Sequence, residues 1–367
     1  MKIGQLTFHG SHNYGSVLQA YALSTQLRTL GHEPEIINLR PQTQKDYYKI
    51  FNNRDIIHKA FTLMIYPKLK RRFTEYERFI SGMLPLSQNE FVNTNEIMSA
   101  NLEYDAYICG GDQIWNPACQ DFEPAYYLAH LADTDTVRRI SYAPSFGKTE
   151  FDQETFCKIC NWVRRFDFIS VRETRGAELI RACSSKPVHV VCDPVLLLNR
   201  DDWEKIAIHN RFRKPYILAY FLSNNHGGRN LIPWLEKETG YDVVILNEFI
   251  RDYFSRYHKA IQTSPKEFVG LLLDASLIYT NSFHGTAFAT LLNKPFYTSV
   301  ASDQDRVSNN SDSRKIDFLK LLGLESRIVG QVNSWDRNTL SIDFRTANIK
   351  LNEFITSSLA YLVQSLE

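Results

Sequence analysis

The chain has 367 residues, a length that favours two domains at ~150 residues per domain. Forty-two Lys and Arg residues balance forty-one Asp and Glu residues, and the formal net charge is +1. Such a small charge excludes recruitment of nucleic acid or of an acidic membrane by a global field, so any phosphate binding must be local. No basic stretch precedes an apolar segment at the amino terminus, and no window reaches ~18 uninterrupted apolar residues, so we expect a soluble, cytoplasmic protein.

The first part of the chain alternates short apolar runs with amphipathic segments, which is the pattern of βαβ units around a parallel sheet. Residues 2–9 predict a strand, and residues 17–32 predict a helix that Gly31 ends. A second strand is predicted for residues 33–39. Residues 45–80 are helical in pattern and rich in aromatic and basic side chains, which indicates an insertion between sheet elements.

Four further apolar runs follow before the pattern changes. They predict strands at residues 104–111, 138–147, 166–173 and 188–195, with a helix at 174–183. The next segment is polar and contains no strand, so we place the domain boundary there. The sequence therefore predicts an N-terminal Rossmann-like domain over residues 1–200.

A second alternation makes up the C-terminal Rossmann-like domain, which we expect over residues 201–345. Ser264, Pro265 and Glu267 have the spacing of a capping box at a helix start. Residues 346–367 are predicted to form a separate amphipathic helix. The other expected elements are strands at 216–223, 241–247, 276–280 and 294–300 and helices at 229–238, 264–275 and 286–293.

One histidine lies where a buried strand passes into a helix. The stretch TNSFHGTAFA puts His284 at the carboxyl end of the strand predicted for 276–280, which is where open α/β sheets bind ligands. The following helix start attracts phosphate or carboxylate and disfavours protonation of a nearby imidazole, so we expect a neutral His284 that can accept a proton. Ser282 and Gly285 are small and leave room for a ligand. The alternative is a histidine bonded to its own backbone near the helix cap.

Two turns of the first domain also place polar residues at strand ends. Asn13 and Gly15 stand at the start of the first helix, where backbone can approach a sugar or a phosphate, although a turn and a cap explain them equally well. Asp112, Gln113 and Trp115 follow a buried strand directly. This combination suits a sugar, whose face stacks on an aromatic ring while its hydroxyls hydrogen-bond. An ordinary loop with a half-buried tryptophan is the alternative.

The segment SVRE places Arg172 and Glu173 at another strand end. Arginine is suited to bidentate recognition of carboxylate or phosphate, and the alternative is a structural ion pair. Arg314 follows a polar loop and opens a helix, so we add it on chemical grounds as a ligand for the phosphate or carboxylate of a donor substrate. An exposed salt-bridging role is its alternative.

Two further features have simpler interpretations. Only Cys157 and Cys160 form a C-x-x-C, and no second pair completes a zinc site, so we expect reduced thiols and no metal, with a redox pair as the alternative. The basic and aromatic stretch 66–79 has Tyr76 and Phe79 at helical spacing for a core. An amphipathic helix with a solvated basic face is expected, and docking on a membrane surface is the alternative.

Seven segments resemble, in order and over nearly the whole chain, the successive blocks of the polysaccharide pyruvyl transferase family. They are HNYGSVLQAYAL, YDAYICGGDQIWNP, ISYAPSFG, SVRE, DPVLLL, TNSFHGTAFA and SRKIDFLKLLGLESR. The resemblance implies a GT-B-like α/β architecture of two Rossmann-like domains facing across a cleft. It also implies transfer from phosphoenolpyruvate onto a sugar diol, giving a cyclic pyruvate ketal in bacterial surface polysaccharide synthesis. Galactose bridged at its 4- and 6-hydroxyls is the first acceptor that the family suggests.

The resemblance also implies roles for particular residues. His284 would be a general acid/base or phosphate ligand and Arg172 a donor ligand, with the C-terminal domain on the donor side. Family members often have Arg or another polar residue where this chain has Ser282, which leaves open the group that binds the donor carboxylate. Asn13, Asp112 and Gln113 are assigned to the acceptor by position. An acid, a base and cationic groups are enough for ketal formation. We therefore expect no cofactor, and phosphoenolpyruvate is the donor substrate.

Two rival classes of protein fit the same pattern. A GT-B glycosyltransferase would use a nucleotide-sugar donor and ignore phosphoenolpyruvate. A catalytically silent carbohydrate-binding or scaffold protein would bind without turnover and would be indifferent to His284→Ala. In every case the expected partner is a sugar, whether nucleotide-linked, lipid-linked or polymeric. A lipid-linked acceptor would bring the protein to the inner face of the membrane.

Overall fold

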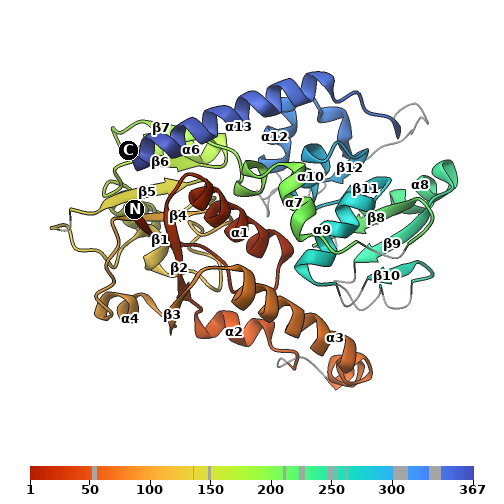
Figure 1. The fold of residues 1–367 in the computed structure, drawn as a ribbon, viewed down its shortest axis with the longest axis horizontal. Helices are drawn as coiled ribbons and strands as arrows, with labels where there is room; N and C mark the ends of the chain where they lie inside the picture. The colour runs from red at the N-terminus through yellow and green to blue at the C-terminus, as the bar shows by residue number, and fades with distance from the viewer. Residues whose placement is uncertain are drawn as a thin grey trace. The chain divides into compact units, whose positions relative to one another are not determined.

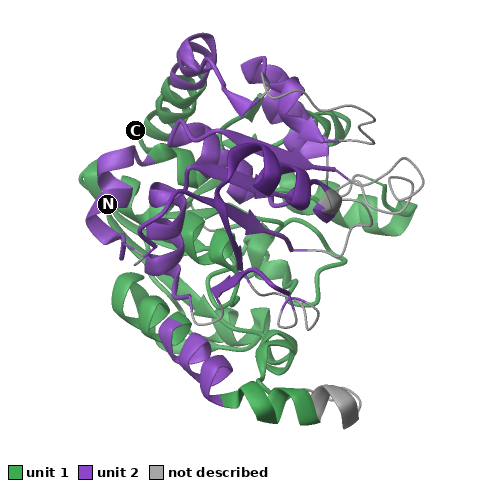
Figure 2. Ribbon diagram, turned by 90° about the vertical axis from the view of Figure 1, so that its right-hand side faces the viewer, with its two compact units in different colours: residues 1–66, 76–197, 354–367 green, residues 67–75, 198–353 purple. Residues whose placement is uncertain are grey.

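The computed structural model describes residues 1–51, 56–134, 136–147, 150–209, 212–222, 228–246, 252, 255–260, 263–300, 313–329 and 340–367. The chain divides into two compact units, coloured separately in Figure 2. Unit 1 comprises residues 1–66, 76–197 and 354–367, and unit 2 comprises residues 67–75 and 198–353. The main part of unit 1 thus ends at residue 197, close to the boundary predicted at residue 200. Unit 1 also includes residues 354–367.

Unit 1 is built on a five-stranded parallel sheet in the order β3-β2-β1-β4-β5 (Figure 1). A short parallel pair, β6-β7, continues from β5 through a bridge between Ile140 and Phe168. The strands are β1 (Lys2–Leu6), β2 (Glu33–Leu39), β3 (Leu86–Phe91), β4 (Ala106–Gly110), β5 (Arg138–Tyr142), β6 (Ile169–Val171) and β7 (Val188–Val190). The helices are α1 (Tyr14–Thr29), α2 (Gln42–Tyr48), α3 (Ile56–Met83), α4 (Thr94–Ser99), α5 (Gln153–Val163) and α6 (Thr174–Arg181).

Unit 2 is built on a six-stranded parallel sheet in the order β10-β9-β8-β11-β12-β13. Its strands are β8 (Tyr216–Tyr220), β9 (Asp242–Leu246), β10 (His258–Ala260), β11 (Leu277–Thr280), β12 (Phe296–Ser299) and β13 (Ile328–Val329). Its helices are α7 (Arg200–Ile206), α8 (Ile232–Thr239), α9 (Pro265–Asp274), α10 (Phe283–Leu291), α12 (Ser313–Leu322) and the first part of α13 (Arg345–Leu366).

The end of α13 belongs to unit 1 and completes its hydrogen bonding. The Tyr361 hydroxyl donates to the Ser141 carbonyl over 2.9 Å, and the Cys192 backbone N–H donates to Ser358 Oγ over 2.9 Å. Tyr361 and Ser358 are both buried. Residues 354–367 are therefore an integral part of the first unit.

The predicted strands and helices are largely confirmed, and the differences have local causes. β3 was not predicted, because it is an edge strand whose Gln88, Asn89 and Glu90 are all exposed and break the apolar alternation. The strand predicted for 138–147 ends at Tyr142, since Ala143 has a φ of 52° and Pro144 follows it.

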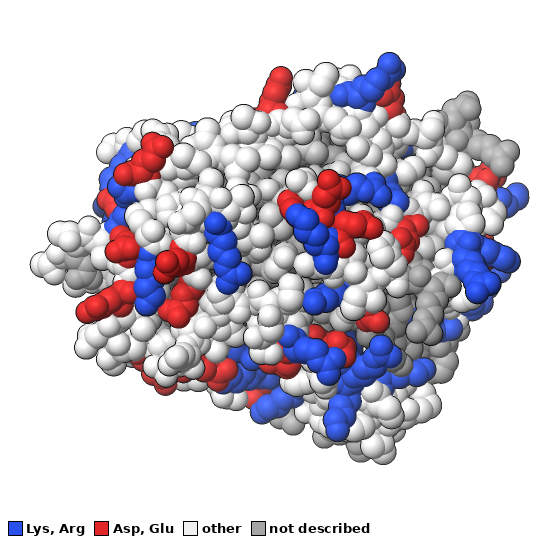
Figure 3. Space-filling view, viewed as in Figure 1, with Lys and Arg blue, Asp and Glu red and all other residues white. Residues whose placement is uncertain are grey.

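The basic stretch 66–79 forms part of α3, as predicted. Tyr76, Phe79 and Ile80 are buried, while Lys68 and Arg71 are exposed. Figure 3 shows basic and acidic side chains interspersed over one face of the molecule, in keeping with the near-zero net charge. Within the described ranges, no helix combines the length and the apolar character needed to cross a bilayer.

The capping box predicted at α9 is present. Ser264 Oγ accepts from the Glu267 backbone N–H over 3.1 Å, and Glu267 Oε2 accepts from the Ser264 N–H over 2.7 Å. We expect Ser264→Ala to lower the free energy of unfolding by about 1 kcal/mol, because it removes the acceptor for a helix N–H. Urea denaturation measures this, with Ser264→Thr as the control that keeps an acceptor oxygen. Equal stability of Ser264→Ala and wild type would show that the cap contributes nothing.

Candidate functional site

His284 lies at the carboxyl edge of the unit 2 sheet. In this sheet β9 lies on one side of β8, and β11 followed by β12 lies on the other side. The connections therefore change direction between β8 and β11, which makes this pair the topological switch point. His284 is the second residue of α10, directly beyond β11, and is 6% exposed. Its ring lies edge-on to that of Phe283, with centroids 5.6 Å apart. The predicted position of His284 at a strand-to-helix junction is confirmed.

The helix start around His284 is fixed by its neighbours. Ser282 is the N-cap, and its hydroxyl accepts from the Gly285 N–H over 3.3 Å. Thr280 Oγ1 donates to the Tyr220 carbonyl of β8 over 2.6 Å and accepts from the Ser282 N–H over 3.0 Å. This network ties the ends of β8 and β11 together and holds the first turn of α10 in one position.

Gly285 serves packing, and the expectation that it leaves room for a ligand is wrong. A Cβ at this position would lie 2.7 Å from Thr280 Oγ1 and 3.1 Å from Thr280 Cγ2. The space above its Cα is therefore already filled by the Thr280 side chain. A glycine is needed here so that α10 can approach the end of β11 closely.

Helix α12 brings two cations to this edge. The Arg314 guanidinium carbon lies 6.0 Å from the Phe283 ring centroid, and Arg314 is only 8% exposed, so an exposed salt-bridging role is wrong. Lys315 is 2% exposed, and its ammonium donates to the Asn281 carbonyl over 2.8 Å and to the Ser299 carbonyl over 2.7 Å. Lys315 thus joins the ends of β11 and β12. It was not predicted, because a lysine on an amphipathic helix ordinarily faces solvent.

In unit 1, Asn13 and Asp112 are brought together at the corresponding edge. The strand order reverses between β1 and β4, and these residues follow those two strands. Asn13 Oδ1 caps α1 by accepting from the N–H groups of Gly15 (2.9 Å) and Ser16 (3.3 Å). The Ser16 hydroxyl donates to Asp112 Oδ2, and Asp112 Oδ1 accepts from the Gln113 N–H over 2.9 Å.

The turn that carries Asp112 depends on glycine. Gly111 has a φ of +70°, and a Cβ there would lie 1.7 Å from Gln19 Oε1. Asp112 itself has a φ of 48°, a left-handed conformation that aspartate tolerates better than most residues. The Gly-Gly pair therefore allows β4 to turn sharply and to present the Asp112 carboxylate toward α1.

The predicted role of Trp115, stacking on a sugar, is wrong. Its side chain is fully buried, its indole N–H donates to the Tyr126 carbonyl over 3.0 Å, and its ring stacks on that of Tyr127 at 4.9 Å. A ring enclosed on all sides has no face left for a sugar. Trp115 is a core residue that anchors the loop, whereas Gln113 remains partly exposed.

Further polar residues extend this edge of unit 1. Gln44 Nε2 donates to Asp121 Oδ2 over 2.9 Å and to Ser11 Oγ over 3.2 Å. Burial raises the pKa of Asp121, although the hydrogen bond from Gln44 opposes that shift. We call Ser11, Ser16, Gln44, Asp112 and Asp121 the unit 1 polar cluster. Gln44 and Asp121 were not predicted, since they lie far from the β1 turn in the sequence.

Arg172 forms a buried ion pair with Asp193. The Nη1–Oδ2 distance is 2.5 Å, and the two side chains are 1% and 0% exposed. The pair forms because Arg172 follows β6 and Asp193 follows the neighbouring parallel strand β7. Burial alone would lower the pKa of Arg172, but the charges of Asp193 and Glu173 outweigh it and raise that pKa. Glu173 instead accepts from the Ser145 hydroxyl and the Phe146 N–H.

The cysteines are all free thiols, with Cys157 exposed and Cys160 buried on α5. Burial and a hydrogen bond with Cys160 raise the pKa of Cys183 to about 12, so this thiol is protonated at neutral pH. Among the residues that the structure describes, no group of three or more His, Cys, Asp or Glu side chains is arranged to hold a metal ion.

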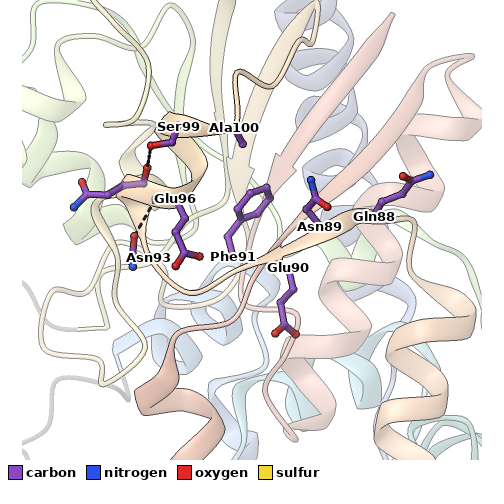
Figure 4. Close-up of a pocket in the computed structure, with 9 residues that line it drawn as sticks. Gln88, Asn89, Glu90, Phe91, Asn93, Glu96, Ser99 and Ala100 are labelled. Carbon is purple, nitrogen blue, oxygen red and sulfur yellow. Dashed lines mark hydrogen bonds between the residues drawn. The ribbon is translucent and has the colours of Figure 1, made fainter.

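An open groove of about 660 Å³ runs along β3 and α4 in unit 1 (Figure 4). Asn93 caps α4 within it by accepting from the Glu96 N–H over 2.9 Å. None of the predicted site residues lines this groove. Its lining residues are Gln88, Asn89, Glu90, Phe91, Asn93, Asn95, Glu96, Ser99 and Ala100.

Comparison with solved structures supports the fold. A putative UDP-N-acetylglucosamine 2-epimerase from Listeria monocytogenes is similar over 99% of this chain and 91% of its own, with a TM-score of 0.50 and 10% identity. A UDP-GlcNAc 2-epimerase from Neisseria meningitidis, bound to UDP-GlcNAc, matches 97% of this chain and 100% of its own, with a TM-score of 0.49 and 13% identity. The fold is GT-B-like, with two Rossmann-like α/β units, as predicted.

Sequence comparison identifies the family. No curated protein sequence matches this chain significantly. The family model described as polysaccharide pyruvyl transferase matches residues 13–304, which contain the Asn13, Asp112, Arg172 and His284 segments. The chain belongs to the polysaccharide pyruvyl transferase family.

Proposed function

We propose that the protein transfers the pyruvyl group of phosphoenolpyruvate onto two hydroxyls of one sugar and so forms a cyclic ketal in surface polysaccharide synthesis. Family membership supports the class of reaction. The observation that carries the proposal is the position of His284 beyond β11, with Arg314 and Lys315 of α12 against the same strand ends. A general acid/base beside cations suits an anionic donor substrate, whose own negative charge would favour the protonated imidazole once it is bound.

The proposed reaction adds a proton to the methylene carbon of the donor, and the adjacent carbon becomes oxocarbenium-like. One sugar hydroxyl loses its proton and attacks that carbon. The bond to the phosphate oxygen then breaks with its electron pair, and the second hydroxyl attacks the same carbon and loses its proton. The products are the ketal and inorganic phosphate, and no cofactor takes part.

The residues divide between the two substrates in this proposal. His284 delivers the proton to the methylene carbon, while Arg314 and the Ser282 region bind the donor. Arg172 is the additional donor ligand that the family implies. Asp112, Gln113 and the α1 start at Asn13 and Gly15 bind the acceptor, for which a galactosyl residue with free 4- and 6-hydroxyls is the first candidate. A lipid-linked acceptor would place the protein at the inner face of the membrane, with the basic face of α3 as the contact.

The test is phosphate release from phosphoenolpyruvate with a panel of galactosyl, glucosyl and mannosyl acceptors, followed by mass spectrometry of the sugar. We expect acceptor-dependent phosphate release and a pyruvyl mass gain on one class of acceptor. Thermal stabilisation by a nucleotide diphosphate, together with no response to phosphoenolpyruvate, would instead favour a GT-B glycosyltransferase.

A further inference from the structure

An open groove without an assigned role runs along β3 and α4, and we call it the β3 groove. Its volume is about 660 Å³, and its lining residues all lie between positions 88 and 100 of unit 1. This volume falls within the range of ~300–1,000 Å³ that is typical of ligand sites. The groove is formed entirely within one unit, so its shape does not depend on the other.

The lining residues that the structure describes include side-chain amides and carboxylates but no lysine or arginine. The amides and carboxylates belong to Gln88, Asn89, Asn93, Asn95, Glu90 and Glu96. Phe91 adds an apolar surface, and Figure 4 shows its ring between Asn89 on one side and Glu96 on the other. Donors and acceptors together suit the hydroxyls of a neutral sugar, while the carboxylates repel an anionic ligand such as phosphate.

Three of these amides are not used by the protein itself. Within the described ranges, no protein group forms a hydrogen bond with the side-chain amide of Gln88, Asn89 or Asn95. All three side chains are exposed and therefore hydrated. A ligand hydroxyl can replace this water and form an equivalent hydrogen bond.

The walls of the β3 groove are held in place by hydrogen bonds to the backbone. Asn93 Oδ1 accepts from the Glu96 N–H over 2.9 Å, and Glu96 Oε2 accepts from the Val92 N–H over 2.8 Å. On the other wall, the Ser87 hydroxyl donates to the Asn89 carbonyl over 2.8 Å. Little of this surface has to become ordered when a ligand binds, which favours affinity.

Helix α2 links the β3 groove to the unit 1 polar cluster. Gln44 belongs to that cluster through its hydrogen bond to Asp121. The next residue, Lys45, forms an ion pair with Glu90 of the groove. Only β2 lies between β1 and β3, so the ends of these two strands are about 10 Å apart. The groove therefore lies beside the residues that we assign to the acceptor.

The loop after β4 makes a second link between the two places. Glu123 lies two residues beyond Asp121 of the polar cluster. Its Oε2 atom accepts from the Thr94 N–H over 3.0 Å and from the Thr94 hydroxyl over 2.7 Å, at the start of α4. Both walls of the groove are thus tied to segments that carry the polar cluster.

We propose that the β3 groove binds a neutral sugar residue of the acceptor chain, at a distance from the diol that reacts beside Asp112. This inference rests on the pyruvyl-transfer function proposed above, and it makes the acceptor an oligosaccharide or polysaccharide chain. A nucleotide-linked single sugar would leave the groove empty. A pyruvate ketal adds a negative charge to a sugar, which Glu90 and Glu96 disfavour. The groove therefore selects segments of the chain that have not yet been modified.

The first test compares single-sugar glycosides with neutral oligosaccharides of the same galactosyl, glucosyl or mannosyl series as acceptors. For wild type we expect a lower KM for the chain than for the single sugar. In Asn89→Ala/Asn95→Ala the KM for the chain should rise about 5- to 100-fold, because each hydrogen bond to a neutral amide contributes a factor of about 2 to 10. The KM for the single sugar should stay at its wild-type value, since a single sugar does not reach the groove.

The matched control for this variant is Asn161→Ala. Asn161 is an exposed asparagine of α5 in the same unit, and it does not line the groove. Its KM for both acceptors should equal that of wild type. Circular dichroism shows whether each variant is folded.

The second test measures binding by titration calorimetry without phosphoenolpyruvate. Wild type should bind a neutral oligosaccharide about 2- to 5-fold more tightly than a chain of the corresponding uronic acid, because the groove is acidic. Glu96→Gln keeps an acceptor for the Val92 N–H and removes the charge, so this preference should become smaller. Glu33→Gln, at the exposed start of β2, is the control and should keep the wild-type preference.

The outcomes separate this inference from the proposed function. Phosphate release with the same KM for single sugars and chains, unchanged in folded Asn89→Ala/Asn95→Ala protein, would overturn the groove site and leave the proposed function standing. Wild-type protein that releases no phosphate with any acceptor would remove the proposed function. In that case a Kd for the neutral chain that the double variant does not change would also exclude the carbohydrate site. If the double variant fails to fold, an undiminished preference for neutral chains in Glu96→Gln protein contradicts the inference.

Discussion

Replacing His284 by alanine is expected to lower kcat about 10²–10⁴-fold, because it removes the group that we propose to protonate the donor. The side chain is buried against Phe283 at the N-terminal turn of α10, and the cap, the Thr280 contacts and the Lys315 bridge do not depend on it. The helix start should therefore survive the substitution. Steady-state phosphate release with a pyruvyl acceptor measures the effect, and circular dichroism reports on the fold.

The matched control is His209→Ala in the same unit. His209 is about half exposed and pairs with Glu204 and Asp274, which raise its pKa. Turnover should remain at the wild-type level in this variant. A folded His284→Ala protein with wild-type kcat would remove His284 from the mechanism.

Replacing Arg172 by alanine is expected to lower the free energy of unfolding by about 3–5 kcal/mol, because it leaves the buried Asp193 carboxylate without its ion-pair partner. Asp193 is fully buried, and of its two oxygens one accepts from Arg172 and the other from the Val195 N–H over 3.0 Å. The sequence alone leaves open whether Arg172 is a donor ligand or part of a structural ion pair. The buried pair shows that stability and activity must be measured separately at this position.

The double variant Arg172→Met/Asp193→Leu makes that separation. Replacing both charges by apolar side chains is often neutral for stability, so we expect unfolding in urea within about 2 kcal/mol of wild type. If Arg172 also binds the donor, the double variant folds but turns over far more slowly. Wild-type turnover in the stable double variant would show that Arg172 serves only in the ion pair. An unchanged free energy of unfolding in Arg172→Ala would contradict the structural role of the pair.

The parts of the site that could be predicted are those fixed by local chain order. Asn13, Asp112 and His284 each follow an apolar run directly, and parallel strands bring such positions to one edge of a sheet. The capping box at Ser264 is equally local. These predictions needed only the periodicity and the identity of the adjacent residues.

The parts that could not be predicted depend on contacts between distant segments. Lys315 reaches the carbonyls of Asn281 and Ser299, and Lys45 reaches Glu90 from 45 positions away. Nothing in the sequence distinguishes these two residues from ordinary surface charges on an amphipathic helix. Trp115 was misassigned for the opposite reason, since a polar neighbourhood along the chain does not reveal that Tyr126 and Tyr127 enclose its ring.

The membership of residues 354–367 in unit 1 has a consequence for biosynthesis. A ribosome makes the strands of unit 1 first, yet the partners of the Ser141 carbonyl and the Cys192 N–H are supplied by Tyr361 and Ser358. While unit 2 is being synthesised, these buried polar groups and the apolar surface beneath α13 remain open to water. The nascent first unit is therefore incomplete until residues 354–367 have been translated, and during that interval it is most exposed to chaperones and proteases.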